Sequence, residues 1–347
     1  MNMNRKMFSV CIPAFNRSKY LPSLLDSILL QDFEGFEIIV CEDCSPERPT
    51  IAATVKSYQS KYPDIIKYYE NETNLGYDAN IRNLIAKATG EFCYFMGNDD
   101  LMCSGSLTHV ADIINRYPNV GFVLKSYSVF ITRPDNIIHE LRYFQKEREF
   151  APGKVAITVC YRRSGVISGY IVRRDDAHAC ATSEFDGTLY YQMYLTANIL
   201  LKRSAVFTPR VLVLCRSGEP PDFGNSTKEK TIYTPGRYTP QARLKMVEGA
   251  LYIVAAFERR NNMHILSDIM LDYANYFYPF IKDQLSLPPR EYYQLYRGYW
   301  KMGFGKFPFF HLYCISCYLL GETNFDKITR AVRKLLGRTV QIGAVLR

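Results

Sequence analysis

The chain has 347 residues, of which 48% are hydrophobic and 22% are charged, so it is long and apolar enough to bury a sizeable core. This composition excludes a disordered chain. Its ten cysteines are scattered without the dense spacing of a secreted disulfide framework, and no signal peptide is visible, which favours reduced thiols in a cytosol. The net charge of +9 is uneven, because residues 324–347 contain six Lys/Arg and one Asp.

The first 130 residues alternate between strand-like and helix-like periods. Strands are predicted at residues 7–15, 36–45, 65–71, 92–97 and 120–130. Helices are predicted at residues 18–31, with a possible Ser18 cap, 49–63, 77–90, closing at Gly90, and 104–117. Continuous apolar strands separated by amphipathic helices predict an α/β fold, with a mostly parallel, Rossmann-like sheet covered by helices on both faces.

The remaining residues divide by composition. Residues 131–217 complete the α/β domain of residues 1–217, with strands expected at 164–174 and 207–217 and a helix just after Asp186. Residues 218–240 are rich in Pro, Gly and charged residues and predict a flexible loop or hinge, followed by a helical, aromatic region at 241–347. Its longest apolar run, residues 307–320, is shorter than the roughly 20 residues that a membrane-spanning helix needs.

Residues 324–338 form a basic amphipathic pattern, with Phe325, Ile328 and Leu335 on one side and Lys327 and Arg330 among the charges on the other. Such a helix can lie in the headgroup region of an anionic membrane. A solvated helix docked on the body of the protein is the alternative.

Two adjacent aspartates, Asp99 and Asp100, follow a predicted strand at the edge of the sheet where ligands bind in parallel α/β folds. Two like charges this close are tolerable in open solvent or beside a cation. Either they begin a solvated turn and cap the next helix, or they hold Mg²⁺ or Mn²⁺, which proteins bind through one or two carboxylates plus substrate phosphates.

Asp43 follows the second strand, where its carboxylate can accept a hydrogen bond from the N–H of a nucleobase. Phe15 and Asn16 end the first strand, beside Asp43 if the two strands are adjacent, and an aromatic face next to such an acceptor suits a nucleobase. An ordinary acidic loop residue is the alternative for Asp43.

These motifs, SVCIPAFNRSKYLPSLLDSIL, EIIVCEDCS and NLGYDANIRNLIAKATGEFCYFMGNDDL, occur in an order and spacing that resemble the amino-terminal half of the inverting family-two nucleotide-sugar glycosyltransferases, which have the GT-A fold. The resemblance covers about the first 125 residues. Two later stretches, SGVISGYIVRRDD and FTPRVLVLCRSGEPPDFGNS, are similar to the branch that contains abequosyltransferase-like enzymes of bacterial O-antigen assembly.

The resemblance implies a role for individual residues. Nucleotide-binding residues would be Pro13, Phe15, Asn16, Asp43, Arg82, Asp99 and Arg216. Asp100, with Asp99, would hold the divalent cation, Mg²⁺ or Mn²⁺, that bridges the donor diphosphate. Asp186 would be the base that activates the acceptor, with Glu184, Asp175 and Asp176 also in range; for Arg82 and Arg216 an ordinary surface position is the alternative.

Three positions depart from the common family pattern. Gly97 stands where many members have the first aspartate of an Asp-x-Asp triplet, Glu42 where Asp is usual and Cys44 where Gly is usual. The first departure bears directly on which residues bind the metal. The spacings Cys41–Cys44 and Cys314–Cys317 are those of zinc half-sites, but the two pairs lie far apart in the chain and do not indicate zinc.

The expected function is therefore metal-dependent inverting transfer of one sugar from a nucleotide diphosphate donor to a surface polysaccharide or a polyprenyl-diphosphate-linked oligosaccharide, at the inner face of a bacterial inner membrane. The alternatives are a metal-dependent nucleotidyltransferase, which would ordinarily have a glycine-rich phosphate loop near the start, and a non-catalytic protein that kept the fold. Because the positive charge is concentrated in an amphipathic tail, a lipid surface is favoured over nucleic acid.

Overall fold

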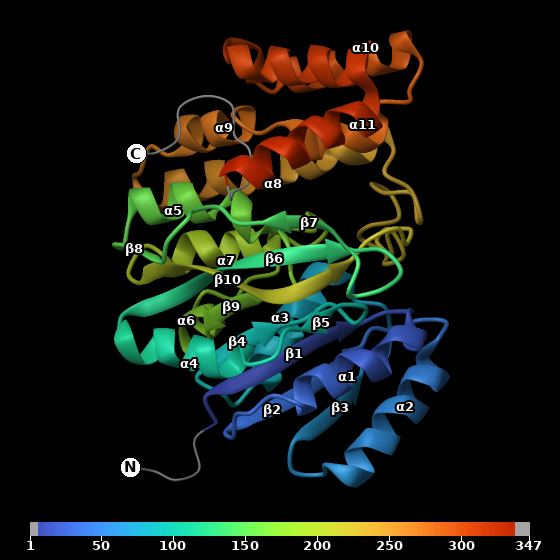
Figure 1. Cartoon of the computed structure of the whole chain (residues 1–347), viewed down its shortest axis with the longest axis vertical. Helices are drawn as coiled ribbons and strands as arrows, with labels where there is room; N and C mark the ends of the chain where they lie inside the picture. The colour runs from blue at the N-terminus through green and yellow to red at the C-terminus, as the bar shows by residue number, and fades with distance from the viewer. Residues whose placement is uncertain (1–5, 337–347) are drawn as a thin grey trace.

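A computed structural model of the chain describes residues 6–336, apart from the side chains of Arg333 and Leu336. The first four long strands lie side by side in the order β3-β2-β1-β4 and run parallel (Figure 1). These strands are β1 (Phe8–Ala14), β2 (Phe36–Glu42), β3 (Ile66–Glu70) and β4 (Phe92–Phe95). The register places Val10 of β1 between Ile38 of β2 and Tyr94 of β4, all of them buried.

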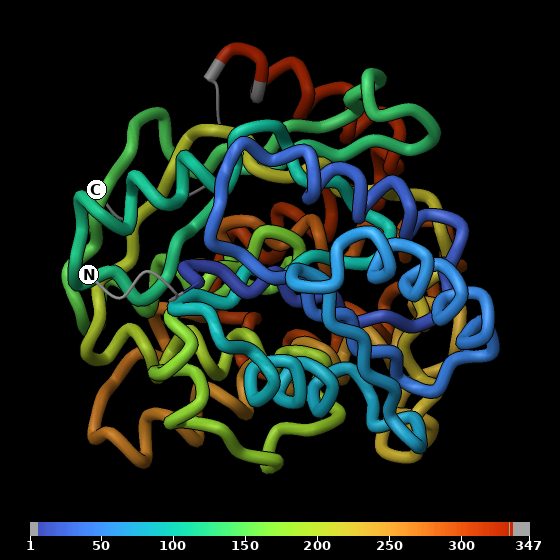
Figure 2. The backbone as a smooth tube through the Cα atoms, turned by 90° about the horizontal axis from the view of Figure 1, so that it is seen from below, coloured from blue at the N-terminus to red at the C-terminus, as the bar shows by residue number. Residues whose placement is uncertain are grey.

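Helices cover both faces of these strands, as the sequence predicted, and Figure 2 shows α1 and α3 on opposite sides. One face packs against α1 (Leu21–Leu29), α2 (Arg48–Lys61) and α4 (Ser106–Arg116). The other packs against α3 (Tyr77–Lys87). Strand residues alternate between the two cores, so that Val10 and Ile12 belong to the first and Cys11 to the second.

Two predicted helix caps are wrong. Ser18 begins the short 3₁₀ helix η1 (Ser18–Tyr20), and its backbone N–H and hydroxyl both donate to Glu47, at 2.8 and 2.6 Å, so it ties this turn to the loop before α2. Helix α3 ends at Lys87, with Ala88 rather than Gly90 as its C-cap. Glycine is needed at position 90 for a different reason, because a Cβ there would lie 2.5 Å from the backbone nitrogen of Ser9.

The second half of the sheet adds strands in both directions. Strand β9 lies antiparallel between β4 and β6, and β10 runs parallel to β6 and carries β5 at its far edge. These strands are β5 (Leu101–Met102), β6 (Val120–Phe130), β7 (Ile137–Leu141), β8 (Arg148–Phe150), β9 (Tyr170–Arg173) and β10 (Ser204–Arg216). The accompanying helices are α5 (Lys154–Cys160), η2 (Arg162–Gly165), α6 (Arg174–Ala179) and α7 (Tyr191–Ile199).

Residues 217–239 form no helix or strand, and we call them the strap; that residues 218–240 act as a flexible loop or hinge stays a prediction. After the strap, the C-terminal helices form a layer above the sheet (Figure 1). They are α8 (Pro240–Asn261), α9 (Leu266–Ala274), η3 (Tyr278–Phe280), η4 (Lys282–Gln284), α10 (Pro289–Lys301), η5 (Phe304–Lys306) and α11 (Pro308–Leu336). Phe277 joins this layer by ring contacts with Tyr299, Phe304 and Phe310.

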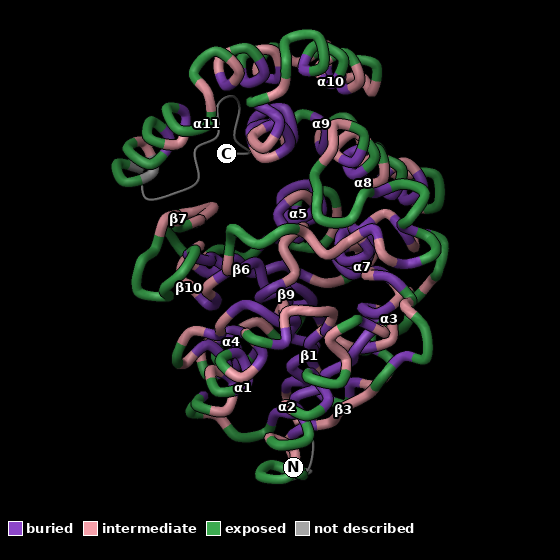
Figure 3. Tube along the Cα trace, turned by 90° about the vertical axis from the view of Figure 1, so that its right-hand side faces the viewer, coloured by how far each residue is buried: buried purple, intermediate pink, exposed green. Residues whose placement is uncertain are grey.

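The predicted tail helix lies within α11, up to Leu336; its last two residues are outside the described part of the chain. Gly321 kinks α11, with φ 73°. Burial in Figure 3 is greatest around the central strands, α5 and α7, whereas α10 and the end of α11 are largely exposed. Among the described residues, no helix is long and apolar enough to cross a membrane.

Candidate active site

A cavity of about 580 Å³ lies at the carboxyl ends of β1, β2 and β4 and extends toward the C-terminal helices, where Tyr276 and Phe280 line it. Of the residues predicted to bind nucleotide or metal, five line this cavity: Pro13, Phe15, Asp43, Asp99 and Asp100. The strands thus bring together side chains that lie far apart in the sequence. In this conformation Asn16, Arg82, Asp186 and Arg216 are not part of the lining.

Asp43 is held at the cavity by the turn that precedes α3. Its Oδ1 accepts hydrogen bonds from the Asn71 side chain and the Leu75 N–H, at 2.8 and 2.9 Å, and its Oδ2 accepts one from the Gly76 N–H at 3.0 Å. Burial raises the pKa of Asp43, although these hydrogen bonds oppose the rise. Because Oδ2 accepts one hydrogen bond from the described residues, a lone pair remains for the N–H of a base.

Glu42 has a structural role, whereas at position 44 the structure shows why glycine is usual and does not explain the cysteine. Glu42 is buried, and its carboxylate accepts from the backbone N–H groups of Cys44 and Ser45 and pairs with Arg48 at 2.5 Å. The longer side chain therefore fixes the turn after β2. Cys44 has φ 56°, in the left-handed region where glycine is ordinarily favoured.

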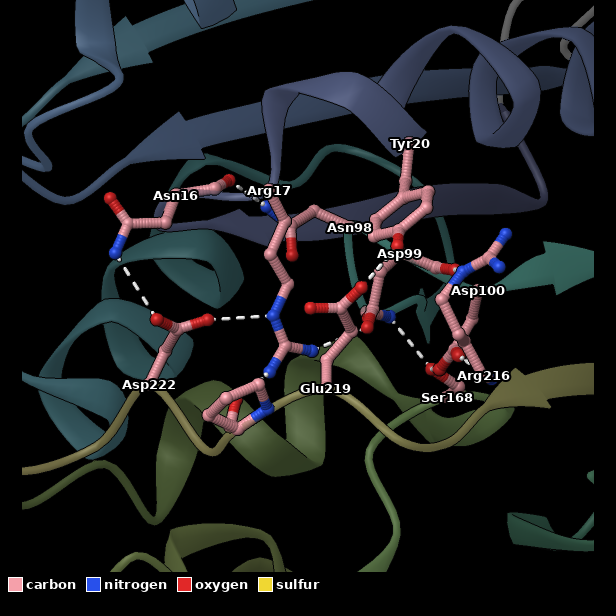
Figure 4. A network of polar contacts seen from close by, with 12 residues as sticks. Asn16, Arg17, Tyr20, Asn98, Asp99, Asp100, Ser168, Arg216, Glu219 and Asp222 are labelled. Atoms are coloured by element: carbon pink, nitrogen blue, oxygen red, sulfur yellow. Dashed lines mark hydrogen bonds and ion pairs between the residues drawn. The ribbon is translucent and has the colours of Figure 1, made fainter. Parts of the chain in front are cut away.

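The aspartate pair follows β4 and is buried, with Asp99 and Asp100 exposed by 6% and 8% (Figure 4). Asp100 accepts hydrogen bonds from the Ser168 hydroxyl and, at 2.6 Å, from the Arg216 backbone N–H. Burial, followed by repulsion from Asp99, raises the pKa of Asp100 to about 7. Burial also raises the pKa of Asp99, although the Arg17 guanidinium opposes the rise. The solvated turn that was the alternative is therefore not what the structure has.

The position of the Ser168 side chain explains why glycine stands at position 97. A Cβ at position 97 would lie 3.0 Å from the Ser168 hydroxyl oxygen and 3.1 Å from Asp100 Oδ2, both closer than ordinary side-chain contacts. The space that an aspartate would need is thus filled by the hydroxyl that binds Asp100. Gly97 N–H also donates to the same hydroxyl, at 2.8 Å.

The acidic pair fits a divalent cation that is shared with a ligand. Two buried carboxylates with raised pKa values lack full compensation by the protein, and hard cations take carboxylate oxygens together with phosphates. Within residues 6–336, no group of three or more His, Cys, Asp or Glu side chains is arranged to hold a metal by itself. A cation here would therefore need oxygens from the donor.

Arg216 and Arg82 do not line the cavity, although Arg216 contacts the acidic pair through its backbone N–H and through Nε, which donates to the Asp99 carbonyl at 3.2 Å. The Arg216 guanidinium packs against the rings of Tyr20 and Phe130, 3.9 and 4.6 Å from their centroids. Arg82 forms a two-pronged ion pair with Asp186, at 2.5 and 3.0 Å. A phosphate role for either arginine stays a prediction.

Asp186 lies in the loop before α7 and is held by two cations, Arg82 and Lys228 of the strap, the latter at 2.8 Å. Burial acts to raise its pKa, but the hydrogen bonds from these two side chains outweigh burial and lower it. The other acids in range are also paired, Glu184 with Arg260, Asp175 with Arg174 and Asp176 with Arg203.

The Asp78 side chain fixes the loop that follows Asp186, a contact that the sequence did not indicate. This buried carboxylate on α3 accepts hydrogen bonds from the N–H groups of Gly187, Leu189 and Tyr191, at 2.8 to 3.0 Å. Burial raises its pKa to about 7. Together with Arg82 one turn later, Asp78 joins the nucleotide-binding half of the domain to the candidate base.

The strap contributes further residues that the sequence did not single out. Asp222 and Glu229 line the cavity, and Glu229 accepts from the Tyr77 N–H at the start of α3, at 3.0 Å. Asn16 donates to Asp222 at 3.1 Å, and Arg17 binds the same carboxylate and also Asp99. A run of Pro, Gly and acidic residues was the signal available for the strap, but composition does not say which side chains face a ligand.

Comparison with known proteins finds a family match for just under half of the chain. Residues 9–171 match the family described as Glycosyl transferase family 2. Abequosyltransferase RfbV of Salmonella typhimurium is 32% identical over 101 residues, which are 29% of this chain and 30% of that protein. The GalNAc(5)-diNAcBac-PP-undecaprenol beta-1,3-glucosyltransferase of Campylobacter jejuni is 39% identical over 101 residues, 29% of this chain and 32% of that protein. The aligned part spans about a third of each of these relatives.

Solved structures share the fold over nearly the whole chain. Staphylococcus aureus TarS 1-349 in complex with UDP-GlcNAc superposes with a TM-score of 0.60 at 18% identity, covering 95% of this chain and 92% of that one. The mannosyltransferase PcManGT of Pyrobaculum calidifontis, in complex with GDP-Man and Mn²⁺, gives 0.53 at 16% identity, covering 92% and 87%. The expected GT-A fold is therefore confirmed.

Proposed function

Since residues 9–171 of this chain match the family described as Glycosyl transferase family 2, we propose that the protein is an inverting glycosyltransferase that uses a nucleotide diphosphate sugar as donor. The observation that carries this proposal is the convergence of Phe15, Asp43, Asp99 and Asp100 on one cavity at the strand ends. A nucleotide-sugar donor is also consistent with UDP-GlcNAc in the TarS complex and GDP-Man in the PcManGT complex.

The donor's nucleotide would lie along the strand ends. Phe15 offers its ring to the base, and Asp43 accepts the base N–H with the lone pair that its backbone contacts leave available. Asp99 and Asp100 would hold Mg²⁺ or Mn²⁺. Such a cation, when bound, stabilises the negative charge of the departing diphosphate.

Asp186 is the proposed general base. In an inverting displacement, a carboxylate removes the proton from the acceptor hydroxyl while that oxygen attacks the anomeric carbon opposite the leaving nucleotide. Lys228 occupies one Asp186 oxygen and belongs to the strap, so movement of the strap would expose that oxygen to an acceptor. Arg82 would keep the carboxylate ionised and oriented.

The far part of the cavity suits an acceptor sugar. Aromatic side chains line it, and their rings can stack on the apolar faces of sugars: Tyr127, Tyr143, Tyr190, Tyr238 and Tyr276. Relatives that act on undecaprenol-linked or poly(ribitol-phosphate) acceptors support a lipid-linked oligosaccharide or surface polysaccharide as acceptor. Biosynthesis of lipopolysaccharide or capsule is the corresponding pathway class.

We further propose that α11 binds an anionic membrane surface, which would put the enzyme at the inner face of the bacterial inner membrane. Leu319 and Leu335 are exposed by 78% and 86%, and Lys327 and Arg330 are also exposed. Changing Lys327 and Arg330 to Glu should reduce sedimentation with phosphatidylglycerol vesicles. Lys56→Glu on α2 is the matched control, and equal binding by both proteins would refute membrane contact by α11.

The test of the main proposal is a panel of nucleotide sugars, with and without Mn²⁺, read by thermal shift and by release of nucleoside diphosphate. A ligand that binds the native state raises the melting temperature, so one nucleotide sugar should give a shift that depends on the metal. Slow metal-dependent release of nucleoside diphosphate from the same compound excludes a non-catalytic scaffold. Release of pyrophosphate from a nucleoside triphosphate and sugar phosphate would instead support the nucleotidyltransferase alternative.

A further inference from the structure

Arg17 occupies the centre of the polar network in Figure 4. It follows β1 in a left-handed conformation, with φ 59°, which is uncommon for a residue with a side chain. Its Nε donates to Asp222 Oδ2 at 2.6 Å, one terminal nitrogen bonds Asp99, and the other donates to the Pro220 carbonyl at 2.7 Å. The guanidinium thus lies between the acidic pair and the strap.

Electrostatics at this end of the cavity create a problem for a diphosphate. Five carboxylates line the cavity, from Asp43, Asp99, Asp100, Asp222 and Glu229, and each repels phosphate oxygens. Arg17 lines the cavity beside two of them. The other cavity arginines lie in the acceptor part and pair with acids of the C-terminal layer, Arg162 and Arg163 with Asp272 and Arg243 with Asp283.

Arg17 now bonds oxygen atoms of the kind that a phosphate would offer it. A guanidinium presents its N–H groups in a planar fork that matches carboxylate and phosphate oxygens alike. Asp222 comes from a segment without helix or strand, bonds the Arg17 Nε through Oδ2 while its Oδ1 accepts from Asn16, and has a side chain that is 32% exposed. Asp222 is therefore positioned as an exchangeable partner, whereas Asp99 is nearly buried and fixed at the end of β4.

We propose that Arg17 binds the diphosphate of the donor and that Asp222 of the strap holds its guanidinium until the donor arrives. The inference rests on the proposed function and extends it to a residue outside the predicted set. On donor binding, a phosphate oxygen replaces Asp222 Oδ2 on the Arg17 Nε. The strap is then released from one of its anchors, while Glu219 keeps its contacts with Lys19 and Tyr20.

Calorimetric titration separates phosphate binding from general effects on the cavity. Each nucleoside diphosphate of uridine, guanosine, cytidine and thymidine is titrated beside its nucleoside, at fixed Mn²⁺, into the full chain. Arg17→Gln should weaken the diphosphate that wild type binds by about tenfold or more, and its nucleoside by less than about twofold. Asp222→Asn should leave diphosphate affinity equal or increase it, because it removes a competing carboxylate. Lys19→Gln, an exposed strap contact, is the matched control and should change neither affinity.

A different pattern overturns the inference. If Arg17→Gln weakens nucleoside and diphosphate equally, Arg17 only supports the shape of the cavity. If Asp222→Asn weakens the diphosphate as much as Arg17→Gln does, Arg17 only anchors the strap. The failure of the proposed function looks different, because wild type would then bind none of the diphosphates, and this inference would fall with it.

Discussion

Two buried carboxylates, Glu37 on β2 and Asp100 just after β4, show how differently the amino and carboxyl ends of the strands are built. At the amino edge, Glu37 of β2 accepts from the Ser9 hydroxyl and from the Thr89 N–H and hydroxyl, at 2.7 to 2.8 Å, and pairs with Lys67 at 2.7 Å. Burial opposes ionisation, but these partners outweigh it and lower its pKa to about 2.

At the carboxyl edge, Asp100 has the opposite balance. Its partners are one hydroxyl and one backbone N–H, a second carboxylate is adjacent, and burial and that neighbour raise its pKa to about 7. The protein fully compensates the charge of Glu37 and leaves that of Asp100 incomplete. Such incomplete compensation is typical of a site that a ligand or cation completes.

Substitution of Asp186 has the largest expected effect. It is also the strongest test of the contrast between Glu37 and Asp100, because Asp186 is proposed to be catalytic and yet is paired with cations as Glu37 is. If it is the base, Asp186→Asn should reduce kcat by 10²- to 10⁴-fold, the usual contribution of general-base catalysis, because the amide cannot accept the acceptor's proton. Nucleoside diphosphate affinity, measured by calorimetry, should change little. A variant with wild-type kcat but lower stability would make Asp186 a structural residue like Glu37.

Asp100→Asn should reduce transfer about 10²-fold, because the neutral amide is a poor ligand for a divalent cation. The stability of the folded variant, by contrast, should not fall. A carboxyl whose folded pKa is raised costs folding free energy progressively as the pH rises from its unfolded pKa near 4 to about 7, and fully above that. Urea unfolding should therefore find the variant at least as stable as wild type at pH 8, with the difference disappearing near pH 4.

Glu37→Gln tests the amino ends of the strands and should cost about 2–3 kcal/mol of unfolding free energy at pH 7. The neutral amide loses the ion pair with Lys67, and the hydrogen bonds from Ser9 and Thr89 no longer go to a charged acceptor. The lowered pKa sets the pH window: the contribution of Glu37 is present above its unfolded pKa of about 4.5 and is lost as the pH falls toward 2. Activity per folded molecule should stay at the wild-type level. A loss of kcat in Glu37→Gln would mean that a change at the amino ends of the strands also affects catalysis at their carboxyl ends.

Gly97→Ala is the smallest change. The added Cβ would lie 3.0 Å from the Ser168 hydroxyl, so that hydroxyl must move by a few tenths of an ångström and its bond to Asp100 weakens. We expect a loss of a few-fold in donor affinity at fixed Mn²⁺. Adding Ser168→Ala makes room and should prevent any further loss, so the two changes should not be additive. Additive losses of donor affinity would mean that Gly97→Ala does not act through Ser168.

The local patterns of the sequence were sufficient for the strands and helices of the first half and for the side chains at the strand ends. Phe15, Asp43, Asp99 and Asp100 could be predicted to meet because each follows a strand of one parallel sheet. The tail helix also followed from its periodicity. Cap positions such as Ser18 were missed because a distant partner, Glu47, competes for the same hydrogen bonds.

Long-range pairing was decided by the tertiary structure. Arg17 and Asp222 are 205 residues apart, and Arg82 and Asp186 are 104 apart, so no local pattern links them. The sequence by itself determined which residues can carry charge at the edge of the sheet, because periodicity fixes strands and strand ends. Which cation faces which carboxylate depended on how the strap and the loop before α7 pack on that edge, since ion pairs form wherever folding brings opposite charges within reach.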